Sequence, residues 1–144
     1  GVEIIPTNTC PPDIKELERR TKLFAEYAPH VQLDVSDGLF SNITSWPYGI
    51  RQYEELRGMA ERGEQLPFAG QVLYETHLMV KKPKDVGLFL IRTGAKRIMG
   101  HIEAFATESE ARETLALWRA NGAEPRPEIR SPTKGLRLRQ HDAQ

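Results

Sequence analysis

Two hydrophobic periods alternate along the chain. Short apolar runs of strand length are each followed by a longer segment whose apolar residues recur every three or four positions. This alternation predicts the order βαβαβαβα, which is typical of a parallel sheet with right-handed crossovers. The strand-like runs are residues 2–7, 30–35, 72–80 and 97–105, and the helix-like segments are residues 11–28, 51–63, 83–94 and 107–122.

Local motifs mark the ends of the expected helices. Asp13 with Glu16, and Thr107 with Glu110, have the spacing of a capping box, in which an N-cap side chain accepts a hydrogen bond from the backbone three residues later. Glycine is common just beyond the last helical turn, because it adopts positive φ without strain. The glycines in this position are Gly63, Gly94 and Gly122.

The periodic pattern ends at Ala123. Residues 124–144 contain prolines at 125, 127 and 132 and many arginines, with little apolar periodicity. This composition predicts an irregular tail rather than a fifth strand. The expected organisation is therefore a (βα)4 domain over residues 1–123 and an irregular tail over residues 124–144.

Composition narrows the class of protein. The 144 residues suffice for one domain, and 20 basic and 20 acidic side chains give a formal net charge of zero. This balance removes the general electrostatic argument for nucleic acid or an anionic membrane, and no apolar run approaches the roughly 20 residues of a membrane span. No signal-peptide pattern is present, and Cys10, the single cysteine, cannot form an internal disulfide. We expect a cytoplasmic protein.

Polar side chains occupy one face of three consecutive expected strands, toward their carboxyl ends. Active sites of parallel α/β folds are built at that end. An aspartate and a histidine on neighbouring strands can bind a divalent metal or act as acid and base. The residues are Gln32, Asp34 and Ser36 on the second strand, Glu75, His77 and Met79 on the third, and His101 and Glu103 on the fourth.

Each of these residues also has an ordinary structural interpretation. A lone histidine on a strand is more often a hydrogen-bonded core residue than a ligand, and Glu103 near a strand end can pair with an arginine. Asp37, next to Gly38, has the position of a turn-capping residue. The occurrence of polar groups on three consecutive strands is what favours a site.

Four motifs in this order carry a family resemblance. "LDVSDGLFSNIT", "ETHLMVKKP" and "GHIEAFATE" resemble the second-, third- and fourth-strand motifs of ribulose-phosphate 3-epimerases, and "IIPTNTCPPD" is a looser match to the first. The resemblance covers about residues 2–123. It implies a TIM barrel that epimerises a ketopentose 5-phosphate at C3, with two aspartates on opposite faces of the substrate and a divalent metal, Zn, Fe, Mn or Mg, on the enediolate oxygens.

The resemblance also assigns roles to residues. Asp34 is the matching acid/base and metal ligand, and His77 is the third-strand metal ligand. Gln32 stands where the family has a metal-binding histidine, and an amide oxygen is a weaker ligand for zinc or iron. The implied substrate-binding residues are Cys10, beside the position of a family serine, Met79 in the sugar pocket, Glu75 in place of an aspartate, and His101 and Glu103 of the fourth-strand motif.

The family's seventh-strand aspartate and phosphate-binding loops have no counterpart in the chain, and a full barrel needs at least about 200 residues. We therefore expect half of a TIM barrel that a homodimer closes, because exposed sheet edges and faces drive association. The alternative is a truncated or degenerate half-barrel that folds and self-associates without chemistry. A related decarboxylase or aldolase-like synthase is a third class, which typically carries lysine where Ser36 stands.

Overall fold

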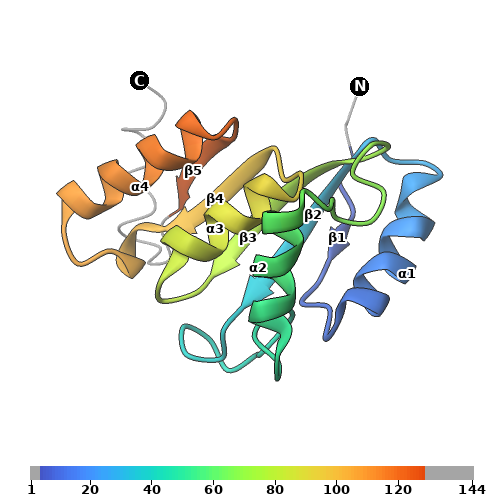
Figure 1. The fold of residues 1–144 in the computed structure, drawn as a ribbon, viewed down its shortest axis with the longest axis horizontal. Helices are drawn as coiled ribbons and strands as arrows, with labels where there is room; N and C mark the ends of the chain where they lie inside the picture. Colours follow the sequence, from blue (N-terminus) through green and yellow to red (C-terminus); the bar gives the residue numbers. More distant parts are fainter. Residues whose placement is uncertain (1–3, 129–144) are drawn as a thin grey trace.

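The computed structural model describes residues 4–128, which form a five-stranded parallel sheet in the order β1-β2-β3-β4-β5 with four α-helices (Figure 1). The α/β class and the parallel sheet predicted from the alternation are confirmed. The strands are β1 (Thr7–Asn8), β2 (His30–Ser36), β3 (Leu73–Met79), β4 (Arg97–His101) and β5 (Glu124–Glu128). The helices are α1 (Ile14–Ala25), α2 (Gln52–Arg62), α3 (Pro83–Arg92), the 3-10 helix η1 (Ile102–Ala104) and α4 (Glu108–Ala120).

The core lies between the sheet and one layer of helices. Every crossover steps to the next strand in the same direction, so the right-handed rule places the helices on a single face. Figure 1 shows α2, α3 and α4 in front of the strands, with α1 beside β1. On β2, Val31, Leu33 and Val35 are fully buried in this core, whereas Gln32 and Asp34 lie on the opposite face and are partly exposed. We call that opposite face the inner face.

The predicted helix caps form. The Asp13 carboxylate accepts a hydrogen bond from the Glu16 N–H at 2.8 Å, and the Thr107 hydroxyl accepts one from the Glu110 N–H at 3.0 Å. Gly63 ends α2 in the left-handed conformation at φ 73°. These contacts are local in sequence, which is why the motifs located the helix ends well.

Three strand predictions need correction. The first strand is Thr7–Asn8 rather than residues 2–7, of which residues 2 and 3 lie outside the described part. β4 ends at His101, so Glu103 lies on η1 and does not share a strand face with His101. Glu124–Glu128 is a strand paired with β4, although residues 124–128 were expected to be irregular; residues 129–144 lie outside the described part.

Prolines on β5 explain the missed strand. The Glu124 N–H donates to the Lys96 carbonyl of the preceding loop, so Glu124 and Arg126 direct their backbone groups toward β4. Alternate residues of a strand face opposite neighbours, and Pro125 and Pro127 therefore stand at the outer edge, where no N–H is needed. Proline content argued against a strand, but it is compatible with an edge strand.

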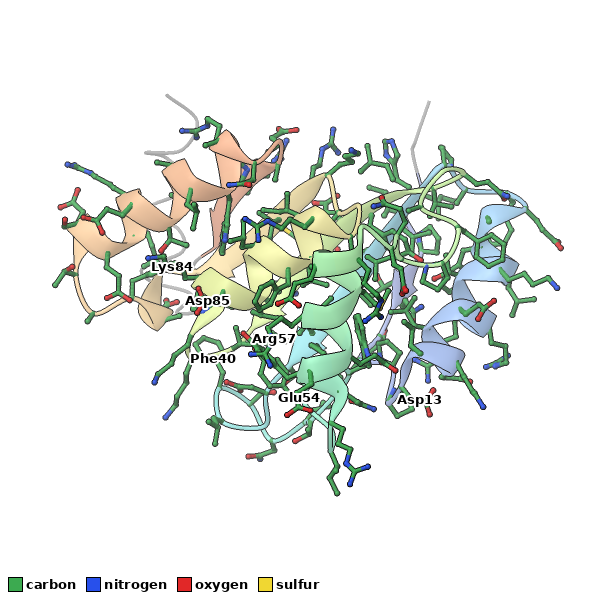
Figure 2. All side chains as sticks on the ribbon, viewed as in Figure 1. Asp13, Phe40, Glu54, Arg57, Lys84 and Asp85 are labelled. Atoms are coloured by element: carbon green, nitrogen blue, oxygen red, sulfur yellow. The ribbon has the colours of Figure 1, made fainter. Side chains whose placement is uncertain are left out.

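Charged side chains surround the helical layer, as Figure 2 shows for Glu54 and Arg57 on α2 and for Lys84 and Asp85 at the start of α3. Within residues 4–128, no helix combines the length and apolar character that crossing a bilayer would require.

Candidate functional site

Parallel pairing aligns the inner-face residues in rows across the strands. Gln32 of β2 lies opposite Glu75 of β3, and Asp34 lies opposite His77. The next row toward the carboxyl ends contains Ser36 and Met79. Adjacent strands are about 4.8 Å apart, so side chains in one row are within contact distance.

Asp34 is held between two side chains. The Gln32 amide nitrogen donates to Asp34 Oδ1 at 2.9 Å, and His77 Nδ1 lies 3.6 Å from the same oxygen. The Asp34 and His77 side chains are only 13% and 16% exposed. An aspartate in the middle of a strand is thus accommodated by a hydrogen bond from Gln32 and by the nearby His77 ring on the inner face.

The imidazole ring of His101, on β4, contacts that of His77. His77 Nε2 and His101 Nε2 are 3.1 Å apart, and His101 Nδ1 lies 4.0 Å from Glu103 Oε2. Phe40, from the loop after β2, stacks on His101 with ring centroids 4.8 Å apart. Figure 2 places Phe40 beside the carboxyl ends of the strands. Asp34, His77, His101 and Glu103 form a continuous series, which we call the polar chain.

Cys10 belongs to the surroundings of Asp34. Burial raises the pKa of the Cys10 thiol, and the negative charge of Asp34 raises it further. A hydrogen bond with Ser45 and the charge of Arg20 act in the opposite direction on this pKa. The net effect keeps Cys10 protonated at neutral pH, so it is a potential proton donor near the carboxylate.

Glu75 lies apart from the polar chain, in a row of ion pairs one step toward the amino ends. Arg97 lies 3.9 Å from Glu75 and 3.1 Å from Glu124, and Arg126 lies 2.9 Å from Glu124. Hydrogen bonds from Arg126 and Arg97 lower the pKa of Glu124. The row therefore balances its charges across β3, β4 and β5.

The remaining polar residues of the β2 end are structural. Asp37 Oδ1 accepts hydrogen bonds from the Leu39 and Phe40 N–H groups, and Oδ2 accepts one from the Lys81 N–H at 2.8 Å. This confirms its predicted role in the turn. The Ser36 hydroxyl is bonded to Ser41 and to the Ile43 carbonyl.

The residues that the resemblance assigned to a metal do not converge on one ion. Asp34 faces the Nδ1 side of His77, whereas Nε2 faces His101, and the Gln32 amide donates to Asp34. Across the described part of the chain, no three His, Cys, Asp or Glu side chains are arranged to hold a metal. The set Gln32, Asp34 and His77 therefore does not fit a three-ligand centre.

The structure brings together Gln32, Asp34, His77 and His101. Glu103 lies beside His101 at one end of this series of side chains, and Cys10 belongs to the surroundings of Asp34 at the other end. Met79 lies in the row of Ser36, and Glu75 pairs with Arg97 instead.

Sequence reasoning missed Phe40 and Arg97. Arg97 could have been found from its place two residues before Met99 on the face of β4 that carries His101. No local motif indicates that the loop after β2 brings the Phe40 ring into contact with His101.

A surface cavity of about 290 Å³ opens beside the β2 and β3 ends, where Asp37, Leu39, Tyr48, Lys81 and Lys82 line it. Burial raises the pKa of the Tyr48 hydroxyl, so this group stays protonated. The cavity presents amines and a hydroxyl beside the carboxyl ends of β2 and β3.

Comparison with known proteins adds no assignment: no protein-family model matches the chain, and the search of curated proteins finds no match.

Proposed function

We propose that the chain is a ribulose-phosphate 3-epimerase-like isomerase, which moves the C3 proton of a ketopentose 5-phosphate. The observation that supports this most is the polar chain, in which Asp34 contacts an imidazole that contacts a second imidazole at the carboxyl end of a parallel sheet. This arrangement suits proton abstraction next to a carbonyl. The motifs quoted above supply the substrate class.

In the proposed reaction, the Asp34 carboxylate takes the C3 proton. The electrons of the C3–H bond form the C2–C3 double bond, and the negative charge moves to the carbonyl oxygen. An N–H of His77 or His101 stabilises that oxygen by hydrogen bonding. The return of a proton to the opposite face of C3 gives the epimer and restores the carbonyl. No step is assigned to a metal, because Gln32, Asp34 and His77 do not converge on one ion.

The group that donates a proton to the opposite face of C3 is proposed to come from a second copy of the chain, which completes the barrel. Two copies of a five-stranded sheet carry ten strands, whereas a TIM barrel has eight. The outer edge of β5 also presents Pro125 and Pro127, which cannot donate to a partner strand. Closure therefore requires β5 to leave β4, so that each copy contributes β1 to β4.

The test is an epimerase assay with a ketopentose 5-phosphate, with and without divalent metals, on protein of known native mass. Asp34→Asn keeps the shape and hydrogen bonding but removes the base, so we expect a loss of at least about 10²-fold in kcat. Glu54→Gln, on the exposed face of α2, is the matched control and should retain activity. Turnover that survives Asp34→Asn would contradict the assignment.

The second candidate is a non-catalytic half-barrel. It is favoured by the row of Glu75, Arg97 and Glu124, which satisfies inner-face charges within one copy. It predicts a folded protein that binds no phosphosugar by calorimetry. A clear binding isotherm with a ketopentose phosphate excludes this candidate.

A further inference from the structure

The surface cavity of about 290 Å³ beside the carboxyl ends of β2 and β3 takes no part in the proposed proton transfer. Five of the described residues line it, and none of them belongs to the polar chain. The loop after β2 supplies Asp37, Leu39 and Tyr48, and the segment between β3 and α3 supplies Lys81 and Lys82. The volume is near the lower limit for pockets that hold small molecules, about 300 Å³. We call it the lysine cavity.

The two walls of the lysine cavity are held in place by contacts within the protein. Asp37 joins them, because its Oδ1 accepts a hydrogen bond from the Leu39 N–H at 2.8 Å and its Oδ2 accepts one from the Lys81 N–H at 2.8 Å. The Tyr48 ring packs against the Tyr53 ring of α2 with centroids 5.9 Å apart. The cavity is therefore formed before any ligand arrives, and the Asp37 carboxylate already has backbone donors.

The other polar groups of the lysine cavity are donors without a protein acceptor. Lys81 and Lys82 are exposed, and neither takes part in an ion pair among residues 4–128. Burial raises the pKa of the half-buried Tyr48 hydroxyl, which keeps its proton and donates to no other described residue. Lys82 is also the N-cap residue of α3, where no side chain caps the helix, so the helix dipole adds to the positive potential of the amines.

These donors match the chemistry of a phosphate monoester. Lysine binds phosphate as a point charge, without the fixed geometry that arginine imposes. A phosphate monoester carries a charge of about −1.5 to −2 at pH 7, which the ammonium groups of Lys81 and Lys82 can balance. The Leu39 side chain and the Tyr48 ring give the same cavity an apolar wall, against which the organic part of a ligand can pack.

We propose that the lysine cavity binds a small phosphate monoester with an apolar body. Lys81 and Lys82 pair with the phosphate, and the Tyr48 hydroxyl donates a hydrogen bond to it. The site lies outside the polar chain, so it goes beyond the proposed function and does not rest on it. The family resemblance does not supply it either, because the family's phosphate-binding loops have no counterpart in the chain.

The experiment is a calorimetric titration of the full chain with phenyl phosphate at low ionic strength. We expect saturable binding that weakens as salt is added, because salt screens exposed amines. Inorganic phosphate, which lacks the apolar body, should bind more weakly than phenyl phosphate, and benzyl alcohol, which lacks the charge, should not bind.

Substitutions locate the site. Lys81→Gln and Lys82→Gln should each weaken phenyl phosphate binding by at least about 3-fold, and the double variant by at least about 10-fold, because each removes one charge. Tyr48→Phe removes only the hydroxyl and should weaken binding by about 3-fold. Lys84→Gln is the matched control: Lys84 is exposed two residues after Lys82 but does not line the cavity, so this variant should bind as the wild type does.

Reductive methylation tests the same site in the unsubstituted protein. Phenyl phosphate should slow the methylation of Lys81 and Lys82 but not that of Lys84, as peptide mass spectrometry measures. The proposal is wrong if phenyl phosphate does not bind, if benzyl alcohol binds as tightly, if the double variant binds as the wild type does, or if Lys84→Gln weakens binding as much as Lys82→Gln.

Epimerase turnover enters none of these readouts, so the failure of one proposal is distinguishable from the failure of the other. Ketopentose 5-phosphate binding at the polar chain should persist in the double variant Lys81→Gln, Lys82→Gln, which separates it from binding in the lysine cavity.

Discussion

Asp34 is a charged side chain in a strand whose alternate residues are fully buried. Val31, Leu33 and Val35 face the helices, so the two-residue period of the strand puts Asp34 on the opposite, polar face. There it meets the Gln32 amide at 2.9 Å and His77 on the adjacent strand. The cost of burying a carboxylate is offset by these polar neighbours, which also make it available for chemistry.

The pKa of the Cys10 thiol depends on the charge of Asp34. Since Asp34 raises the pKa of the thiol, Asp34→Asn should lower that pKa. The pH midpoint of iodoacetamide alkylation should therefore move down, and alkylation at pH 8 should be faster than in the wild type. Cys10 is the only cysteine, so mass spectrometry of the intact protein reads this reaction directly.

Glu54→Gln, which removes a charge from exposed α2, should leave the alkylation midpoint unchanged. An unchanged midpoint in Asp34→Asn would show that Asp34 does not act on the thiol.

At the scale of elements, α3 and α4 pack through one tryptophan. Trp118 is fully buried, and its Nε1–H donates to the Lys84 carbonyl at 3.0 Å. Gly87 of α3 lies against this ring, and a Cβ there would come within 2.6 Å of Trp118 Cε2. Glycine at this helical position is required by the close approach of the ring.

We expect Gly87→Ala to destabilise the fold by about 1–3 kcal/mol, because a buried indole ring cannot move away as a flexible chain can. Urea denaturation followed by tryptophan fluorescence measures this.

Gly58→Ala in α2 is the matched control. Its Cβ would meet the Arg62 guanidinium, which is the far end of a flexible side chain, so helix propensity should make this change neutral or stabilising by about 1 kcal/mol. Equal stability of the two variants would contradict the packing argument.

At the scale of the whole molecule, the polar chain lies on one face of a sheet whose edges, in residues 4–128, are β1 and β5. The large exposed apolar side chains of this part lie elsewhere, as Leu39, Ile43 and Ile50 do in the segment between β2 and α2. Association through the inner face would therefore bring together polar and charged side chains. Such an interface gains most from hydrogen bonds and charge pairing.

We expect native mass spectrometry to give a dimer of the 16.4 kDa chain, with the β5 amides exchanging rapidly because closure displaces this strand from β4. Hydrogen–deuterium exchange on the same sample measures the exchange rate of the β5 amides, with the protected β2 and β3 amides as the internal reference. A monodisperse monomer with protected β5 amides would contradict barrel closure by two copies.

Much of the fold follows from short-range features of the sequence. The hydrophobic periods predicted four helices and the second, third and fourth strands, and Asp13, Thr107 and Gly63 located helix ends through contacts within a few residues. The face alternation also placed Asp34 and His77 on one side of the sheet. These features depend on local geometry, which a sequence encodes directly.

Tertiary structure decided the rest. The register between strands brings His77 Nε2 to His101 and joins Glu75 to Arg97, and the loop after β2 carries Phe40 onto His101. The end of β4 at His101 and the addition of β5 beside it likewise depend on which backbone groups find partners across the sheet. The sequence by itself determined that Gln32, Asp34, Glu75 and His77 share the inner face. Only the packed sheet determined which of their atoms meet, because contacts between strands join residues far apart in the sequence, 24 positions for His77 and His101.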